Sequence, residues 1–509
     1  MTRVHAAGIG LLIVVVLAFL TTTHLGSQGA YYDELFQAPA AFLFIGSHPI
    51  FFTQAYQGVP ILNMSYVGAI KSDVYGLYLK FIDPHFSLIT WRLLGITFVS
   101  IGLFGFYWLA GTSLGLEGAL LFAALLLTDI SVIITTRHDW GPTALALALR
   151  LILIGIWLSL EFDELVDRKF VIAGFIVGIS IFEKLSSIVL LGPFAILIFK
   201  PRKWIAATAG LVLGAVPLLV VNAATFRAGA GFISLSNAEN DRWPFSLHGL
   251  LGYAYRFLSL GHGEMARAHV LGEFSNAVFV AAEATLLISA IVIVFASAIR
   301  PARLMAAAYL AISVGLLLLP RETFIHHWLI GTPFQYTAIV LALAALDRRT
   351  VMYKFLLATV VCLILIRIPT LASVEIAFVS GKASTAFDPA FNRLMKIAAS
   401  RWKDAVFIAS DWGSATQIYC SMNGADEAVF EPIWGTYSAK DVLNIASTTK
   451  KRNLYVVTTG LAPQFADTSA SIVDAMTNAP DWQSVPLDEE VASLHPIRIL
   501  KFVRRVNSS

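Results

Sequence analysis

The sequence predicts an α-helical polytopic membrane protein that ends in an α/β domain. Two features of its composition predict the membrane part: 57% of the 509 residues are hydrophobic, and the mean hydropathy is +0.73. This composition is too apolar for a soluble fold. The third observation is a change of pattern after about residue 380, where β-rich runs alternate with segments of helical periodicity.

The composition also excludes several classes of function. The net charge is only +3, and no basic block is interleaved with aromatic residues, which argues against nucleic acid as a partner. The two cysteines, Cys362 and Cys420, exclude a disulfide framework and a cysteine-based zinc site. Membrane lipids are the partners that this composition favours.

The first apolar run covers residues 6–25 and follows Arg3. Its length approaches the roughly 20 residues that cross a bilayer, and it has no clear Ala-x-Ala cleavage site. We therefore interpret it as a retained span and not as a signal peptide. In both cases the segment YYDELFQAP, residues 31–39, emerges on the far side of the membrane.

Further apolar runs cover residues 89–110, 117–134, 142–160, 204–221, 277–298, 304–319, 328–346 and 354–372. The segment 170–199 is ambiguous, because Glu183 and Lys184 interrupt it. It is either one tilted helix or two short helices that meet at the charged pair. Two helices allow the later runs to alternate across the membrane, which gives about eleven spans in total.

Basic residues set the predicted orientation of these spans. The predicted inner connections contain Arg3, Arg168, Lys169, Lys200, Arg202, Lys203, Arg300, Arg303, Arg348, Arg349 and Lys354. The short outer turns contain only Arg137, Lys184 and Arg321. This bias predicts an N-terminus in the cytoplasm and a C-terminal domain outside it.

The chain is therefore expected to have two domains. A membrane domain covers residues 1–375, with large outer loops at 28–88 and 222–276, and an extracytoplasmic α/β domain covers residues 380–509. Within the first loop, residues 34–45 and 59–82 have the amphipathic character of helices on a membrane surface. In the C-terminal domain, DAVFIAS, NLYVVTT and IRILKFV predict strands, and FNRLMKIAASRW and AKDVLNIASTTKK predict helices.

Polar residues gather at the predicted outer ends of the spans. Asp33 and Glu34 directly follow the first span in a chain with only 14% charged residues. Other outer turns contain Arg137, His138, Asp139, Glu183, Lys184, Arg321, Glu322, His326 and His327. An acid pair beside a span is often only a solvated turn, but a charge near the bilayer centre costs roughly 2.5 to 3.5 kcal/mol. Clusters in several turns of one face therefore predict a shared functional site.

Carboxylates and cations beside an apolar wall suit a lipid-phosphate-linked sugar donor. Basic groups hold the phosphate, the wall holds the isoprenoid chain, and a carboxylate takes the proton of an attacking hydroxyl. The alternative is a lipid-linked substrate transporter or flippase, but the charges lie at one face, and no inverted pair of broken helices is present in the sequence. A third interpretation, an assembly protein with an exported tail, leaves the outer clusters unexplained.

These features resemble the C-type (GT-C fold) membrane glycosyltransferases. Within them they are similar to the bacterial branch of protein O-mannosyltransferases and lipid A aminoarabinose transferases, which is glycosyltransferase family 39-like. The resemblance covers the layout of about residues 1–370. It rests on the acid pair after the first span, the amphipathic first loop, the turn RHDWGP, the lysine of the short hairpin, and RETFIHHWLIGTPF before a late span.

The resemblance implies an inverting glycosyltransferase, either a hexosyl- or a pentosyltransferase, in the bacterial inner membrane. The implied donor is a polyprenyl-phosphate sugar, and the acceptor is a hydroxyl of a protein, lipid or glycan. The expected catalytic residues are Asp33 as the general base, Glu34, which shapes the acceptor site, and Asp139, which matches the acid of the second outer loop. The soluble tail matches no role known for the family, so the acceptor stays open.

Binding roles follow from the same resemblance. The expected ligands of the donor phosphate are Arg137, Lys184, Lys71 and Arg321, although Lys71 also fits a lysine that snorkels to the interface. His138, His326 and His327 are expected to bind substrate. For the last two, a helix cap near Trp328 is the alternative.

No cofactor is expected to be required. Asp33, His138, Asp139, His326 and His327 are suitable side chains for a divalent metal, but their spacing is scattered and no HExxH motif occurs. A metal therefore stays an alternative. The DWG of the second outer loop recurs at residues 411–413, where we interpret it as a coincidence or as a helix cap by Asp411.

Overall fold

The computed structural model divides the chain into two compact units. It describes residues 1–49, 51–160, 167–197, 201–236, 246–260, 263–319, 323–382, 384–434, 438–460, 463–487, 494 and 496–505. The first unit comprises Met1–Leu25, Met64–Gly68 and Arg92–Ala377, and the second comprises Gly26–Asn63, Ala69–Trp91 and Phe378–Ser509. Compact units need not coincide with membrane and soluble parts, so the division at residues 375–380 stays a prediction.

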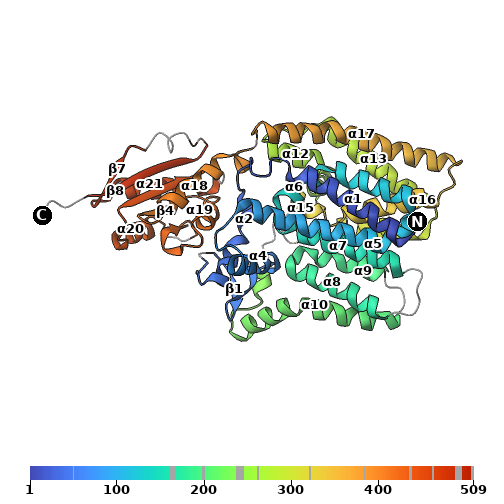
Figure 1. The fold of residues 1–509 in the computed structure, drawn as a ribbon, viewed down its shortest axis with the longest axis horizontal. Coiled ribbons are helices and arrows are strands. Elements are labelled where there is room, and N and C mark those ends of the chain that lie inside the picture. Colours follow the sequence, from blue (N-terminus) through green and yellow to red (C-terminus); the bar gives the residue numbers. More distant parts are fainter. Residues whose placement is uncertain are drawn as a thin grey trace. The chain divides into compact units, whose positions relative to one another are not determined.

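The first unit consists mainly of long helices whose axes run nearly parallel or antiparallel (Figure 1). They are α1 (Arg3–Thr22), α5 (Leu88–Thr128), α6 (Ile130–His138), α7 (Thr143–Leu160), α8 (Asp167–Glu183), α9 (Leu191–Leu197), α10 (Pro201–Arg227), α11 (Leu247–Leu260), α12 (Gly263–Leu271), α13 (Ala277–Ala296), α14 (Arg300–Leu317), α15 (Ile325–Trp328), α16 (Thr332–Ala345) and α17 (Val351–Val379). A 3-10 helix, η2 (Leu185–Leu190), precedes α9, and η3 (Ile233–Leu235) follows α10.

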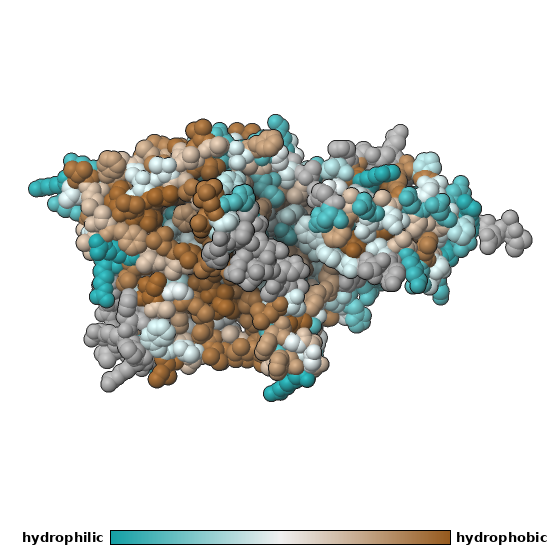
Figure 2. Space-filling view, turned by 180° about the vertical axis from the view of Figure 1, so that it is seen from behind, coloured by the Kyte–Doolittle hydropathy of each residue, from teal (hydrophilic) through white to brown (hydrophobic). Residues whose placement is uncertain are grey.

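The long helices of this unit are built to span a membrane. Among the described residues, six helices have the necessary length and apolar character: Arg3–Thr22, Leu88–Thr128, Lys203–Arg227, Ala277–Ala296, Arg300–Leu317 and Val351–Val379. Large apolar side chains such as Leu12, Ile205 and Val292 are exposed on them, and Figure 2 shows the hydrophobic surface that such side chains form. The predicted polytopic membrane protein is therefore confirmed, while the number of about eleven spans stays a prediction.

The long helix α5 contains an internal break. Gly115 has a φ of +69° and a ψ of −178°, a backbone conformation that glycine adopts without the clash of a Cβ atom. This break lies between the predicted runs 89–110 and 117–134, so α5 consists of two helical segments.

Helices α8 and α10 pack with their backbones in close contact. A Cβ atom added to Gly174 would lie 1.9 Å from the carbonyl oxygen of Ala207, and one added to Gly178 would lie 2.2 Å from that of Leu211. Such small residues at four-residue spacing let helices approach closely in membranes. Gly174 meets Ala207 and Gly178 meets Leu211, so α8 and α10 run parallel. The chain between them must therefore cross back to the end at which α8 begins. The ambiguous segment 170–199 is therefore not one tilted helix: α8 ends at Glu183, and η2 and α9 follow Lys184.

A buried ion network joins four helices of the first unit. The guanidinium of Arg367 on α17 donates to Glu283 on α13 at 2.7 Å and to the hydroxyl of Tyr336 on α16 at 2.8 Å. Tyr336 in turn donates to Asp129, whose other oxygen caps α6 by accepting the N–H of Ser131 at 2.9 Å. The network fixes the start of α6, and the predicted polar turn lies at the other end of that helix.

The second unit contains most of the segment that is predicted to form the first outer loop. Its elements are α2 (Tyr32–Leu35), α3 (Ala38–Ala41), η1 (Phe42–Ile45), β1 (Gln54–Tyr56), β2 (Val59–Met64) and α4 (Ile70–Phe81); β3 (Val67–Gly68) follows β2 but belongs to the first unit. The loop was expected to hold a helix over residues 59–82. This prediction was wrong for its first part, because VPILNM pairs with β1 in an antiparallel hairpin. The β-branched residue and the proline at its start favour an extended chain.

The C-terminal part of the second unit is an α/β domain, as predicted. Its five-stranded sheet has the order β5-β4-β6-β8-β7. The strands are β4 (Ala405–Ala409), β5 (Val429–Phe430), β6 (Asn453–Thr458), β7 (Trp482–Val485) and β8 (Arg498–Arg504), and the helices are α18 (Ala390–Arg401), α19 (Ala415–Ser421), α20 (Ser438–Thr448) and α21 (Ala466–Thr477). β4 is parallel to β5 and β6, whereas β8 is antiparallel to β6 and β7. DAVFIAS, NLYVVTT and IRILKFV therefore contain strands β4, β6 and β8.

The helices of this domain form two pairs: α18 packs with α19, and α20 packs with α21. Side chains of β4 and β6, such as Val406 and Leu454, share one buried core with Val442 of α20 and Ile472 of α21. The chain therefore leaves β4 toward one pair and leaves β6 toward the other. The loops at the carboxyl ends of these adjacent parallel strands diverge, which is the topological switch point of an open α/β sheet.

Contacts within the second unit hold the first loop on this α/β domain. The side-chain amide of Gln417 on α19 donates to the carbonyl of Ala30 at 2.9 Å. The rings of Tyr32 and Trp412 lie 4.2 Å apart between centroids, and Asn392 on α18 donates to the carbonyl of Gln28 at 3.0 Å. The C-terminal domain thus positions the segment that contains Asp33 and Glu34.

Candidate active site

The acid pair lies on the short helix α2 of the second unit. Asp33 is partly exposed, whereas Glu34 is fully buried. A side-chain hydrogen bond joins the hydroxyl of Tyr31, the N-cap of α2, to the Asp33 carboxylate; burial raises the pKa of Tyr31, and the Asp33 charge raises it further. Tyr31 therefore acts as a hydrogen-bond donor, and it orients the accessible carboxylate of the pair.

Glu34 and Lys71 lie around the same tryptophan. The indole N–H of Trp91 donates to the backbone carbonyl of Glu34 at 3.0 Å, and the Lys71 ammonium lies 4.0 Å from the centroid of the Trp91 ring. Lys71 is only 1% exposed, which does not fit a lysine that snorkels to water. A buried cation–π contact instead places its charge in the unit that contains the acid pair.

Gln37, one turn after Asp33, is a buried polar residue that the sequence analysis did not single out. Its side chain is fully buried, and neither amide atom has a hydrogen-bond partner among the described residues. Its backbone carbonyl accepts from Ser72, which also contacts Asn63. A buried amide without a partner is costly, so Gln37 is a candidate substrate-binding residue.

In the first unit, the turn between α6 and α7 gathers the predicted residues of the second outer loop. Arg137, His138 and Asp139 are all buried. Asp139 has left-handed backbone angles (φ 45°, ψ 52°), and its carboxylate accepts the N–H of Ala144 at 2.7 Å. The carboxylate thus caps the start of α7, a structural contact that the predicted catalytic role did not anticipate.

Lys184 reaches this turn from the end of α8. Its ammonium donates to the carbonyl of Gly141 at 2.6 Å, and its backbone forms a bridge with Val67. A Cβ atom added to Gly141 would lie 3.3 Å from the Lys184 Nζ and 3.4 Å from the His326 Nε2. Lys184 and His326 therefore converge on one glycine, where a side chain would occupy the space between them.

The two histidines of α15 are buried and differ in their hydrogen bonds. His327 Nδ1 accepts the N–H of Phe324 at 3.0 Å, which caps α15, whereas His326 Nδ1 has no partner in the described part of the chain. Burial, followed by the nearby Lys184 charge, lowers the pKa of both histidines well below its ordinary value. Both imidazoles are therefore neutral at pH 7. His327 is a helix cap, as the alternative interpretation expected, whereas the Nδ1 atom of His326 is available for a ligand.

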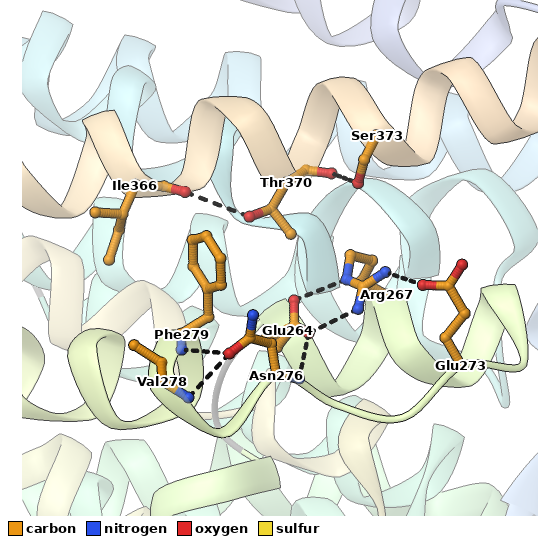
Figure 3. Close-up of polar contacts among 9 residues, drawn as sticks. All are labelled: Glu264, Arg267, Glu273, Asn276, Val278, Phe279, Ile366, Thr370 and Ser373. Carbon is orange, nitrogen blue, oxygen red and sulfur yellow. Dashed lines mark hydrogen bonds and ion pairs between the residues drawn. The ribbon is translucent and has the colours of Figure 1, made fainter.

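Aromatic rings line the turn on its other side. Trp140 stacks on His269 with centroids 4.6 Å apart, and Phe324 contacts Trp140 edge-on at 5.4 Å. Polar contacts hold α12, the helix of His269, in place (Figure 3): both carboxylate oxygens of Glu264 accept from Arg267 at 2.8 Å, and one also accepts the N–H of Asn276 at 2.7 Å.

Arg150 is a cation of this region that the sequence analysis missed. It lies on α7, is only 2% exposed, and donates to the hydroxyl of Ser187 at 2.9 Å. Its charge acts on His327, as does that of Lys184. An arginine inside the apolar run 142–160 is the signal that would have found it, because such a charge is rarely placed in a span without a function.

The predicted residues thus fall into two sets. The first unit contains Arg137, His138, Asp139, Lys184, His326 and His327, and the second contains Asp33, Glu34 and Lys71. Arg321 lies outside the described residues. No group of three or more His, Cys, Asp or Glu side chains among the described residues is arranged to hold a metal ion. Buried cations beside neutral imidazoles in the first unit form a site that suits an anion.

Structural similarity over 98% of the chain shows that it shares the fold of two solved structures, and this fold agrees with the fold class that the sequence predicted. The similar structures are those of ArnT from Cupriavidus metallidurans. The one bound to undecaprenyl phosphate has a TM-score of 0.59 and 13% identity over 98% of each chain, and the apo form has a TM-score of 0.58 and 14% identity over the same shares. No protein-family model matches the sequence, and no curated protein sequence matches it.

Proposed function

We propose that the protein is an inverting glycosyltransferase of the bacterial inner membrane. It moves a pentosyl or hexosyl group from a polyprenyl-phosphate donor to a hydroxyl acceptor on the outer face of that membrane. The N-terminus lies in the cytoplasm and the C-terminal domain in the periplasm. The observation that carries the proposal is the convergence of Lys184 and His326 on Gly141.

The cationic site of the first unit supports a phosphate as its ligand. Lys184 and Arg150 are nearly completely buried, and a buried cation is costly unless an anion compensates it. Charge-assisted hydrogen bonds to a phosphate provide this compensation. The fold adds support, because the ArnT structure of the same fold is bound to undecaprenyl phosphate.

In the proposed reaction the partly exposed Asp33 accepts the proton of the acceptor hydroxyl. The hydroxyl oxygen then attacks C1 of the sugar from the side opposite the phosphate, and the bond between C1 and the phosphate oxygen breaks. The electron pair of this bond leaves with the polyprenyl phosphate, whose additional negative charge Lys184 and Arg137 stabilise. Attack from the opposite side inverts the configuration at C1.

Two experiments test this function. Mass spectrometry of lipids that co-purify with the protein should detect a polyprenyl-phosphate sugar, because buried cations and apolar helices retain such a lipid. The purified protein in nanodiscs, given undecaprenyl-phosphate pentoses and hexoses with a bacterial envelope extract as acceptor, should release undecaprenyl phosphate. Release that is absent for every donor would contradict the proposal.

The second candidate function is a lipid-linked substrate transporter. The buried network of Asp129, Glu283 and Arg367 favours it, because ionisable residues inside a membrane often mark transport pathways. A transporter moves its lipid between leaflets without cleaving it. A fluorescent polyprenyl-phosphate sugar in proteoliposomes distinguishes the two, since only a transferase separates sugar from lipid.

A further inference from the structure

The carboxyl edge of the C-terminal sheet has the topology of a ligand site. Open α/β sheets bind ligands beyond the carboxyl ends of their strands, at the switch point. In this domain the switch point lies between β4 and β6. The residues that follow these strands are Ser410, Asp411 and Trp412 after β4, and Thr459 and Gly460 after β6. They play no part in the proposed transfer reaction.

Asp411 lies at this edge of the sheet and accepts the hydrogen bonds that an anion would need. One carboxylate oxygen accepts the N–H of Thr459 and that of Gly460, both at 2.8 Å, and the Thr459 hydroxyl at 3.1 Å. These N–H groups are the donors that would otherwise hold a phosphate. The expectation of a helix cap by Asp411 was wrong, because Ser414 is the N-cap of α19 and Asp411 instead joins the ends of β4 and β6.

The other oxygen of Asp411 is available to a ligand. Asp411 is only 2% exposed, and its Oδ1 has no hydrogen-bond partner among the described residues. A buried acceptor without a donor costs roughly 1 to 3 kcal/mol, and more when it is charged. A hydrogen-bond donor from outside the chain would remove this cost.

Glu431, directly after β5, repeats the arrangement. One of its oxygens accepts the indole N–H of Trp434 at 2.8 Å, and the other, Oε1, is buried and has no partner in the described part of the chain. Burial, and then the charge of Asp411, raises the pKa of Glu431 to about 7. Among the described residues, Asp411 is the charged group that acts on Glu431. No described cation forms an ion pair with either carboxylate.

An aromatic ring adjoins the two acids. Trp434 is 65% exposed, and the ring of Phe465 contacts it edge-on at 5.3 Å between centroids. An exposed tryptophan beside two carboxylates without a cation is an arrangement that recognises ammonium groups, because both the carboxylates and the face of the ring attract positive charge.

We propose that this edge of the sheet binds the primary ammonium group of an organic amine. The ammonium donates to Asp411 Oδ1 and Glu431 Oε1, and the carbon skeleton lies against the ring of Trp434. The ring of Trp412 packs at a tilt against that of Tyr32, the residue before Asp33, so the site adjoins the acid pair within the second unit. A role in recognising an amine-bearing acceptor rests on the proposed function, whereas amine binding itself does not.

Saturation-transfer NMR on the full-length protein in detergent tests the site. The probes are ethanolamine and glucosamine, and ethylene glycol and glucose are their neutral controls. We expect both amines to bind and both neutral compounds to fail. Binding of ethanolamine should be several-fold weaker at about pH 6 than at about pH 8, because protonation of Glu431 removes one of the two charges that attract it.

Matched variants assign the binding to these residues. Glu431→Gln should weaken ethanolamine binding about tenfold or more, since charge-assisted hydrogen bonds are the strong ones. Glu427→Gln, an exposed acid of the same domain, should leave it unchanged. Trp434→Phe retains the ring and should have the smaller effect of the two site variants.

Three outcomes would overturn the amine site. They are equal binding of glucose and glucosamine, an unchanged affinity of Glu431→Gln, and binding of calcium chloride with no response to either amine. Sugar transfer is measured on the same preparations. Amine binding without transfer would contradict the proposed function alone, and transfer without amine binding would contradict this inference alone.

Discussion

At the residue scale, the hydrogen-bond partners of polar side chains separate candidate catalytic residues from residues that stabilise the fold. Asp139 has a structural partner for its carboxylate, whereas Asp33 is partly exposed and receives a hydrogen bond from Tyr31. The sequence led us to expect that both acids are catalytic, with Asp33 as the general base. These contacts favour Asp33 as the base. They show that Asp139 also stabilises the turn that contains Gly141.

The first prediction concerns Asp33. Asp33→Asn retains the size of the side chain but removes its basicity, so transfer should fall about 10² to 10⁴-fold, or roughly 3 to 5 kcal/mol of barrier. Donor binding should persist, because a base acts mainly in the transition state. Glu34→Gln should have a smaller effect.

Sugar transfer and donor-lipid binding by the purified variants check this expectation. Asp83→Asn, on an exposed turn of the same unit, is the matched control and should transfer normally. Near-normal transfer by Asp33→Asn would end the assignment of Asp33 as the base.

The hydrogen bond from Tyr31 leads to a prediction for pH dependence. A hydrogen bond to a carboxylate favours its charged form and lowers its pKa, so Tyr31→Phe should raise the pKa of the base. The acidic limb of the kcat/KM profile, where a base loses activity on protonation, should therefore move to higher pH by about one unit. Activity above that limb should change little. Tyr56→Phe, an exposed tyrosine, should leave the profile in place, and an unshifted profile for Tyr31→Phe would leave the hydroxyl without a catalytic role.

Lys184 and Arg150 carry the third prediction. If they compensate a phosphate charge, Lys184→Ala and Arg150→Ala should each raise the KM for the donor about tenfold or more, since each contact contributes on the order of 1.5 to 3 kcal/mol. The KM for the acceptor should change less. Steady-state kinetics with both substrates varied provide the comparison, and Lys169→Ala is the control on a helix end away from the turn. A loss confined to the acceptor KM would reject the phosphate assignment.

At the element scale, the sequence predicted most helices and strands but not how they meet. Apolar runs predicted α13 and α17, which are long enough to cross a bilayer, and also α7, which is a shorter apolar helix. The strand β2 was missed because VPILNM is apolar at most positions, so a helix on a membrane surface and a strand have the same pattern there. The position of Arg150 beside the α15 histidines depends on contacts between distant segments, which no local pattern encodes.

The close packing of α8 on α10 yields the fourth prediction. Gly178→Val would place a side chain 2.2 Å from the carbonyl of Leu211, so the helices must separate or shift. We expect a lower midpoint of thermal unfolding in detergent, since overpacking typically costs about 1 to 3 kcal/mol. Because α8 ends directly before Lys184, donor affinity should fall as well.

The control for this substitution is Gly8→Val on α1. A Cβ atom added to Gly8 meets nothing within 4 Å, so the same change of side chain tests the helix without the close contact. If both variants unfold at the same temperature, the glycines of α8 are not needed for its packing on α10.

At the scale of the whole molecule, the predicted fold class depended on composition and the expected site on resemblance. The strand patterns predicted the α/β domain. They did not predict that this domain contacts the segment of the acid pair through Gln417 and Trp412. These residues are ordinary members of a soluble fold, and only the folded chain brings them to Ala30 and Tyr32.

The last prediction concerns orientation in the membrane. α17 is a single helix, Val351–Val379, that is long enough to span a bilayer. Reporter fusions near Arg348 and after residue 509 should therefore lie on opposite sides, whatever the total number of spans. The basic residues around Arg348 and Lys354 place that loop in the cytoplasm. A reporter active only outside the cytoplasm should accordingly be inactive near Arg348 and active at the C-terminus. Reversed signals would mean that the C-terminal domain and the acid pair lie in the cytoplasm, which would contradict a transferase that acts on the outer face. Equal signals would mean that α17 does not cross the membrane.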